Sequence, residues 1–326
     1  RSKKHYLNAL SYDSEDEITH LYLYYNYLHT GHLLAARLHA GKLSEPTRSY
    51  NQVKAFHALY SMDAEYSFKR PELFFRENDL REDAHFRRIG LLTLPTYRLS
   101  LYQSLSGFQQ EYDYGNNTNQ LEYSAFLSWQ ATSTLNFTGG YRYVGTRSVV
   151  HPDTFYTPGN SFSAKLNYNW HRFDLAGSYH HFTTDYLQVN QWGIHLGTGF
   201  SGRLPVYLKS SLYRMNETGT DYNTLEEYNY PHIVFNQTAG VGFLKGRLWI
   251  EGSTTWGDQR YFVANDGLYF YNSLVPVVVK TGGSITAYLM KNLALTLHYG
   301  VEKKHLVMWD EYYKQHGITG GIQWKM

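Results

Sequence analysis

The sequence predicts an all-β fold, a transmembrane antiparallel up-and-down β-barrel of about 14 strands, with 12–16 as the range. Polar and apolar residues alternate along many segments, as they do in strands with two different faces. These segments are about 9–11 residues long, close to the length of a tilted strand that crosses a bilayer. The chain is also rich in aromatic residues, with 32 Tyr, 17 Phe and 7 Trp among 326 residues.

The composition supports a membrane setting and excludes several other classes. Tyr and Trp combine an apolar ring with a polar tip, so they concentrate at membrane–water interfaces. The chain has no cysteine, which excludes disulfides and thiolate metal sites. Its net charge of +2 gives no argument for a nucleic-acid partner. No run of about 18 apolar residues predicts a transmembrane helix.

The first 95 residues alternate less regularly than the rest. We expect residues 18–43 to form a β-hairpin that turns at Thr30 and Gly31. Residues 53–62 and 86–94 are interpreted as two further strands. The charged stretch 70–88 breaks the alternation, and a loop, a short helix and a folded-in segment all stay open for it. The whole chain, residues 1–326, is predicted to be one barrel domain, with residues 1–17 as an N-terminal extension or plug segment.

From residue 97 onward the alternation is clear. In residues 161–170, Phe162, Ala164 and Leu166 fall on one face and Lys165 falls on the other. Short turns at one end and long polar connections at the other are typical of outer-membrane barrels, whose turns are periplasmic and whose loops are extracellular. The long connections are predicted at residues 149–160, 183–190, 216–230, 257–276 and 303–315. The remaining predicted strands are 121–130, 135–143, 173–182, 192–200, 206–214, 235–243, 247–256, 279–289, 293–302 and 317–326.

Soluble sandwiches, propellers and solenoids also alternate, so the position of the aromatic residues decides between these classes. The sequence shows no repeat of blade or solenoid length. The large aromatic residues of the apolar faces gather near strand ends, as in the aromatic girdles of membrane barrels. The predicted girdle residues are Trp129, Tyr143, Trp170, Tyr179, Trp192, Trp256 and Trp324.

The last strand carries a resemblance to a known class. Residues 317–326, GITGGIQWKM, place Ile318, Ile322 and Trp324 on one face. This segment resembles the C-terminal strand of Gram-negative outer-membrane β-barrels, although it ends in Lys-Met rather than in an aromatic residue. The Tyr-rich loops are similar to those of Bacteroidota barrels. The resemblance implies a cell outer-membrane location, in contact with lipid and lipopolysaccharide.

If the apolar faces meet lipid, the polar faces line the lumen. The ionisable residues predicted to line it are Arg142, Lys165, His195, Lys209, Glu251, Lys280, His298 and Glu302. In residues 245–262, KGRLWIEGSTTWGDQRYF, this register turns Leu248 and Ile250 to the acyl chains and Glu251 to the lumen. The same register also turns Trp249 inward, which is the one position that fits poorly.

No catalytic, cofactor or metal site is predicted. Ser178 and His180 lie on one strand face, but their Cα atoms are about 6.6 Å apart, which is long for a nucleophile and its base. Loop histidines such as His151 and His305 come together only if the loops fold that way, and no structural zinc spacing is present.

These observations predict a passive channel, or the membrane subunit of a nutrient-uptake complex, for small polar solutes. The first alternative is a non-conducting barrel that anchors a surface lipoprotein or a larger envelope complex through its aromatic loops. The second alternative is an outer-membrane lipid hydrolase, but we expect the chain not to be an enzyme.

Overall fold

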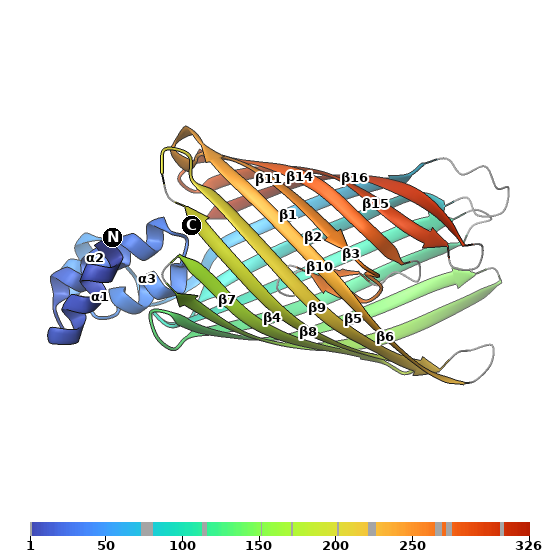
Figure 1. Cartoon of the computed structure of the whole chain (residues 1–326), viewed down its shortest axis with the longest axis horizontal. Coiled ribbons are helices and arrows are strands. Elements are labelled where there is room, and N and C mark those ends of the chain that lie inside the picture. The colour runs from blue at the N-terminus through green and yellow to red at the C-terminus, as the bar shows by residue number, and fades with distance from the viewer. Residues whose placement is uncertain are drawn as a thin grey trace.

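A closed antiparallel barrel of fourteen strands dominates the computed structural model, which confirms the predicted fold class (Figure 1). The structure describes residues 2–72, 81–112, 116–150, 152–170, 172–200, 202–220, 226–264, 269–271, 276–306 and 310–326. The barrel strands are β1 (His57–Pro71), β2 (Arg81–Leu94), β3 (Leu99–Tyr112), β4 (Asn117–Gln130), β5 (Leu135–Val150), β6 (Asp153–Trp170), β7 (Phe173–Thr184), β8 (Leu187–Phe200), β9 (Val206–Thr220), β10 (Glu227–Phe243), β11 (Leu248–Trp256), β14 (Val277–Met290), β15 (Leu293–Leu306) and β16 (Glu311–Lys325).

The two ends of the chain close the barrel. β1 pairs with β16 in antiparallel register from Ser61 opposite Lys325 to Pro71 opposite Gln315. Around the rest of the cylinder the barrel strands follow chain order, and each is hydrogen-bonded to the barrel strand before it and to the one after it. Because a bilayer offers backbone groups no hydrogen-bond partner, a sheet can span it only when closure leaves no free edge.

The outer surface is apolar, as expected for contact with lipid. On β15, Leu295, Leu297 and Tyr299 point outward and are 41%, 57% and 50% exposed. The alternate residues Thr296 and His298 point inward and line the central cavity. On β11, Ile250 is exposed on the outside while Glu251 and Trp249 face inward, so the register predicted for this strand is correct.

Trp249 faces inward because glycine leaves room for its ring. Gly242 lies opposite Trp249 in the ladder, and Gly240 lies opposite Tyr207 on the other side of β10. The Tyr207 and Trp249 rings contact each other over these glycines, with centroids 5.7 Å apart. The Trp249 Nε1–H donates to the carbonyl of Gly246 at 3.1 Å, which satisfies its polar atom in the β10–β11 turn.

The β-hairpin predicted for residues 18–43 is wrong, because this stretch forms helices. The helices are α1 (Ser2–Tyr12), α2 (Glu17–His29), α3 (Leu33–Ala40) and α4 (Glu45–Tyr50). The buried positions of α2 include His20, Leu23 and Tyr27, which recur at the spacing of three and four residues that defines a helix face. Eight of the eleven residues from 18 to 28 are Ile, Leu or Tyr, which hid that spacing in the sequence. Among the described residues, no helix has the length and apolar character needed to cross a membrane.

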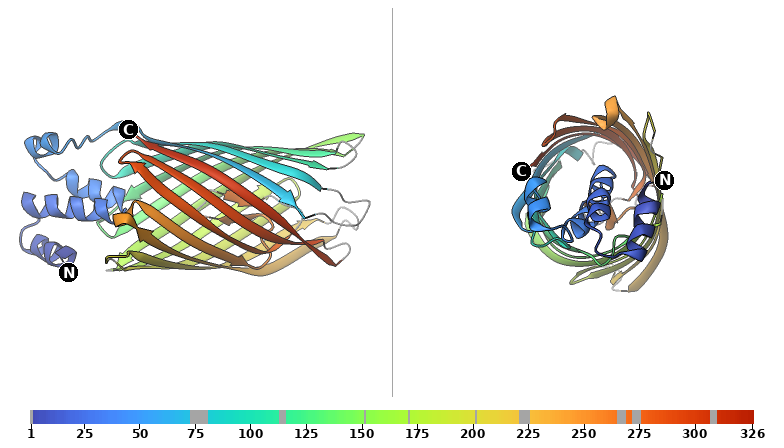
Figure 2. Two further views of the ribbon diagram at one scale, coloured as in Figure 1. Left: turned by 90° about the horizontal axis from the view of Figure 1, so that it is seen from above. Right: turned by 90° about the vertical axis from the view of Figure 1, so that its left-hand side faces the viewer.

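The helices form a cap at the end of the barrel that carries the short turns, here called the turn end (Figure 2). Arg37 of α3 is 4% exposed, and its Nη2 donates to the carbonyls of Ala55 at 2.6 Å and Thr96 at 3.2 Å. Its guanidinium also lies over the ring of Tyr97, 5.6 Å from the centroid. Burial lowers the pKa of this guanidinium. The cap is therefore anchored to the β2–β3 turn through one buried side chain.

Several predicted loops are shorter than expected, because the strands extend beyond the bilayer-spanning part. The predicted loops 149–160 and 183–190 are wrong, since β5 and β6, and β7 and β8, continue to tight turns. The charged stretch 70–88 belongs to β1 and β2 at its two ends, and residues 73–80 lie outside the described part of the chain.

The connection 257–276 is long, but its described part folds into the barrel rather than outward. It contains a small two-stranded sheet of β12 (Phe262–Ala264) and β13 (Tyr269–Tyr271). The loop begins at Gly257, whose φ of +107° and close approach to the backbone of Ile233 leave no space for a Cβ.

Substitutions on the two faces of β15 test directly which face meets lipid and which faces the lumen. We expect Leu297→Arg, on the lipid face, to lower the free energy of unfolding by about 2–4 kcal/mol in lipid vesicles. The neighbouring change Thr296→Arg, on the lumen face, should cost far less because water can reach the guanidinium. Urea titrations of both variants in vesicles measure the difference. Equal losses would contradict the assigned faces.

Candidate functional site

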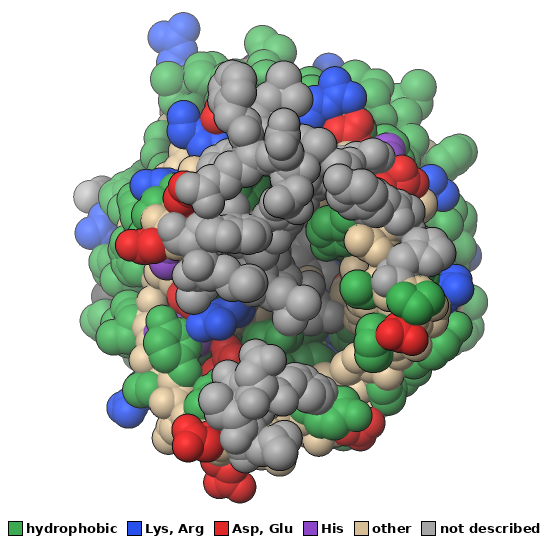
Figure 3. Space-filling model, turned by 90° about the vertical axis from the view of Figure 1, so that its right-hand side faces the viewer, with side chains coloured by type: hydrophobic (Ala, Val, Ile, Leu, Met, Phe, Trp, Pro, Cys, Tyr) green, Lys and Arg blue, Asp and Glu red, His purple; other side chains and the backbone are tan. Residues whose placement is uncertain are grey.

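A cavity of about 1820 Å³ occupies the interior of the barrel. Residues from the whole length of the inner wall line it, from Asp63 and Tyr288 toward the turn end to Lys304 and Tyr230 toward the loop end. The view onto the loop end shows acidic and basic side chains around the rim and hydrophobic side chains around the outside (Figure 3). A lumen of this size, with a wet inner face, is the natural candidate for a functional site.

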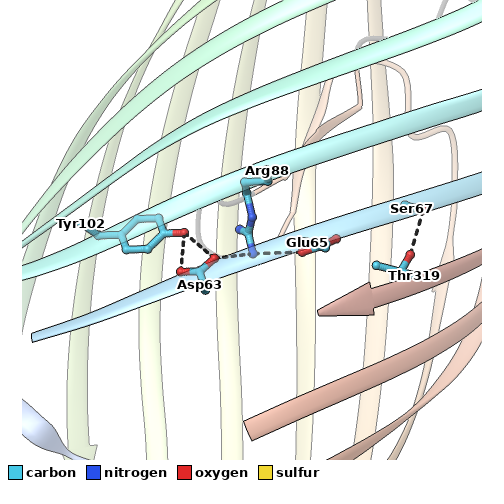
Figure 4. Close-up of polar contacts among 6 residues, drawn as sticks. All are labelled: Asp63, Glu65, Ser67, Arg88, Tyr102 and Thr319. Carbon is cyan, nitrogen blue, oxygen red and sulfur yellow. Dashed lines mark hydrogen bonds and ion pairs between the residues drawn. The ribbon is translucent and has the colours of Figure 1, made fainter. Parts of the chain in front are cut away.

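One wall of the lumen carries a charged network on β1, β2 and β3. Arg88 Nη2 lies 3.0 Å from a Glu65 oxygen and 3.3 Å from an Asp63 oxygen. The Tyr102 hydroxyl donates to the Asp63 carboxylate at 3.1 Å (Figure 4). Farther along β1, Thr319 of β16 donates to Ser67 at 2.8 Å, which joins the last strand to the first. Two carboxylates share one guanidinium here, so this part of the wall has a negative excess.

A second ion pair lies deeper on β4 and β5. Arg142 and Glu122 are 3% and 5% exposed, and their charged groups are 3.6 Å apart. The Arg142 Nε–H also donates to Ser124 at 2.9 Å, and Gln120 donates to Glu122. Because burying an unpaired charge is costly, the pairing of Arg142 with Glu122 lowers the cost of holding both charges within the wall.

A third group of charges surrounds Glu302 on β15. Lys69 Nζ lies 2.7 Å and Lys280 Nζ lies 3.4 Å from its Oε1, while Lys304 Nζ lies 3.7 Å from its Oε2. We call these four residues the lysine cluster. Charges of both signs therefore line the cavity, but they are separated along its wall.

The opposite wall carries a patch of apolar side chains, and the loop that begins at Gly257 covers this patch. Phe262, Val263 and Phe270 of this loop pack in one hydrophobic cluster with Phe182 and Met215 of the wall. Phe182 and Phe270 have ring centroids 4.5 Å apart. The loop is thus held by a hydrophobic core inside the barrel, where it narrows the lumen from one side.

Gln191 of β8 fastens this loop to the wall. Its Nε2 donates to the carbonyl of Val263 at 2.9 Å, and its Oε1 accepts from the amide of Val263 at 3.0 Å. Gln191 is 1% exposed, so both bonds are shielded from water. The Gln191 carboxamide thus bonds both the N–H and the C=O of Val263, as the backbone of a neighbouring strand would.

The lumen also contains a hydrogen-bonded row of serine and histidine. Ser178 Oγ lies 2.9 Å from His195 Nε2, and His195 Nδ1 lies 2.9 Å from Ser211 Oγ. The histidine paired with Ser178 is therefore His195 of the next strand. His180, the partner considered from the sequence, contacts Ser163 at 2.7 Å instead. In a serine hydrolase a carboxylate orients the histidine, whereas here Ser211 contacts that ring nitrogen. The row therefore lacks the carboxylate of a Ser-His-Asp triad.

The structure puts all eight predicted pore residues on the inner face. Four of them line the cavity directly: Glu251, Lys280, His298 and Glu302. Arg142 lies beneath the ring of Phe270, and His195 lies in the serine row. Lys165 and Lys209 face inward beside Ser178 and Thr238, their partners in the ladder.

The seven predicted girdle residues all lie on the outer face. Trp129, Trp170 and Trp324 stand near the turn end, whereas Tyr143, Tyr179, Trp192 and Trp256 lie nearer the loop end. On this outer face, tyrosine hydroxyls also bond to polar groups of the adjacent strand. Tyr179 donates to Asn190 at 2.7 Å, and Tyr141 donates to Asn160 at 2.7 Å.

The sequence interpretation missed the charged residues of β1 and β2. Asp63, Glu65, Ser67 and Lys69 alternate with Ala64, Tyr66 and Phe68, which is the pattern of a lumen-facing strand. That signal was present, but the charged stretch beginning at residue 70 obscured where the strand ended. Within the described residues, no group of three or more His, Asp or Glu side chains is placed to hold a metal ion. His305 pairs instead with Asp310 at 2.9 Å, and His151 lies outside the described residues.

Comparisons with known proteins agree on the fold. The toluene transporter TodX of Pseudomonas putida superposes with a TM-score of 0.56 at 10% identity, over 83% of this chain and 91% of that one. The monoaromatic hydrocarbon channel CymD gives 0.55 at 9% identity, over 82% and 88%. The toluene transporter TbuX of Ralstonia pickettii gives 0.52 at 9% identity, over 83% and 90%. No family model and no curated protein matches the sequence.

This chain has the fold of an outer-membrane β-barrel. The closed fourteen-strand cylinder and its apolar outside have the architecture of the channels above, and a bilayer explains both features. At this level of identity the likeness concerns the fold, so the solute must be argued from the lumen of this chain.

The loop contact makes a testable prediction. Gln191→Ala removes both side-chain bonds to Val263, which should weaken the docked loop by about 2 kcal/mol. We expect faster hydrogen exchange of the amides around Val263, by about 10–30-fold. Gln188→Ala, on the outer face of the same strand, is the matched control. Unchanged exchange in Gln191→Ala would show that the aromatic packing alone holds the loop.

Proposed function

We propose that this chain is a passive outer-membrane channel for small polar solutes. The observation that carries the proposal is a lumen of about 1820 Å³ whose wall bears acidic and basic side chains over its length. Such side chains favour solutes with charges or hydrogen-bonding groups of their own. An apolar solute would gain little from this wall and would have to displace its water.

The separation of the two signs of charge supports this solute class. The Asp63–Glu65–Arg88 network has a negative excess, and the lysine cluster has a positive excess. A polar solute in the cavity therefore experiences a field that changes sign along this wall. The loop that begins at Gly257 narrows the passage, which limits the size of the solute.

The names of the structural neighbours suggest another solute class, monoaromatic hydrocarbons, which the experiment must separate from ours. The full chain is reconstituted in planar bilayers and in liposomes. We expect a steady ionic conductance, together with liposome swelling in small sugars and amino acids. If the protein shows neither conductance nor swelling but takes up toluene, the result would favour a hydrocarbon channel. Absence of every flux would leave a non-conducting barrel.

Charge removal from the lumen gives the corresponding mutational prediction. Changing Lys209→Gln and Lys280→Gln together removes two inward positive charges. We expect the reversal potential in a salt gradient to shift toward cation preference, while the single-channel conductance stays within about twofold. The variant Lys291→Gln, in the β14–β15 turn, should leave the reversal potential unchanged. An unshifted double variant would show that ions do not pass these residues.

A further inference from the structure

A second cavity lies on the outside of the barrel, near the loop end of strands β2 to β6. Its volume is about 620 Å³, and we call it the outer groove. Because Arg88 and Glu122 face the lumen, the alternate residues Arg87 and Leu121 face outward. The groove residues used below are His85, Arg87, Gly107, Leu121, Gly145 and Arg147.

Three successive rungs of the β2–β5 ladder place the outer groove at the boundary between apolar and polar surface. The rung on its turn-end side is formed by Ile89, Leu105, Tyr123 and Tyr143. The rung on its loop-end side is formed by His85, Gln109, Asn119 and Arg147. The rung between them is formed by Arg87, Gly107, Leu121 and Gly145. The groove therefore lies where the hydrocarbon of a bilayer gives way to its headgroups.

Two glycines in the middle rung create the depression. A Cβ added at Gly107 would meet only the carbonyl of Gln120, at 3.8 Å, so the space above this residue is open. At Gly145 the ring of Tyr143 fills part of that space, since its Cε1 lies 3.3 Å from the position of a Cβ. Leu121 stands between the two glycines and is 55% exposed. The floor of the groove is therefore apolar and open enough to receive a hydrocarbon chain.

Two arginines stand at opposite sides of this floor. Arg87 lies on β2 and Arg147 on β5, three strand spacings apart, which is about 14 Å. In the part of the chain that the structure describes, neither guanidinium has an ion-pair or hydrogen-bond partner. A guanidinium that faces a membrane is stabilised by an anion, and a phosphate group matches its planar set of donors.

The acidic side chains of the same outer surface are bonded elsewhere. Asp83 of β2 accepts from Arg70 at 2.9 Å, and Glu111 of β3 accepts from Gln109 at 3.1 Å. Neither carboxylate lines the groove. The outer groove therefore combines an apolar floor with an excess of positive charge.

We propose that the outer groove binds a phosphorylated lipid of the surrounding leaflet. An acyl chain lies over Gly107 and Leu121, and phosphate groups meet Arg87 and Arg147. The wide separation of the two arginines suits a lipid with two phosphate groups, such as the lipid A part of lipopolysaccharide. This site goes beyond the proposed channel function and does not depend on it, because it lies on the other side of the wall.

Two variants test the site through its two components. Arg87→Gln combined with Arg147→Gln removes both positive charges and keeps hydrogen-bonding side chains of similar length. Gly107→Leu fills the floor at a position where a Cβ has room. Heat-modifiable gel mobility and circular dichroism check that each variant folds.

Each variant has a matched control on the outer face. Arg214→Gln removes an arginine of β9 that lies between Trp192 and Ile233 in the ladder, outside the groove. Gly177→Leu adds the same side chain to β7, where no atom lies within 4 Å of a Cβ.

Native mass spectrometry of the full chain in detergent counts the bound lipid molecules. Bisphosphorylated lipid A is the probe, and monophosphorylated lipid A and phosphatidylethanolamine are the comparisons. We expect saturable binding of the probe, about tenfold tighter than that of the monophosphorylated form. The affinity should fall about 10–30-fold in the double arginine variant and about fivefold in Gly107→Leu, and should stay within about twofold in both controls.

Three results would overturn the site. Unchanged affinity in either test variant removes the recognition assigned to the arginines or to the floor. Equal weakening by Arg214→Gln shows a general attraction between charges rather than a site. A cross-linked dimer that disappears in Gly107→Leu assigns the groove to a second copy of the chain. If the double arginine variant does not fold, the comparison of Gly107→Leu with Gly177→Leu still decides the question.

Discussion

Closure of the barrel through β1 and β16 is the constraint on which the other features depend. Eleven residue pairs join these strands, and they satisfy the backbone groups that a bilayer would leave without partners. Closure also divides every strand into a lipid face and a lumen face. The outer face can then be apolar without a core behind it, and the inner face must satisfy its own polar groups.

The interior meets that requirement differently on its two sides. From β14 through β16 to β5, ion pairs connect adjacent strands: Glu65 contacts Arg88, Glu122 contacts Arg142, and Glu302 contacts Lys280. Between β5 and β10 the wall carries an apolar patch beside its polar residues, and the loop after Gly257 covers this patch with Phe262 and Phe270. A wide barrel therefore encloses a narrower polar passage beside a small hydrophobic core.

The prediction from sequence was most accurate where apolar and polar residues alternate along a segment. Residues 161–170 alternate without interruption and residues 247–256 do so except at Trp249, and the faces and register of both are correct in the structure. It failed for residues 18–43, where the apolar and polar residues follow neither a clear strand period nor a clear helix period. It also ended β5 too early and began β6 too late, since Thr154 and Thr157 are ordinary strand residues that resemble a polar loop when their pairing partners are unknown.

The sequence by itself determined the barrel class and the inward direction of residues such as Glu251 and Lys280, because side-chain alternation is a local property of a strand. It limited the number of strands only to the range 12–16. Only the tertiary structure decided which charges meet. Lys69 and Glu302 are 233 residues apart in the chain and 2.7 Å apart in space. That contact exists because the barrel closes, and closure joins the first strand to the last through hydrogen bonds that no local pattern specifies.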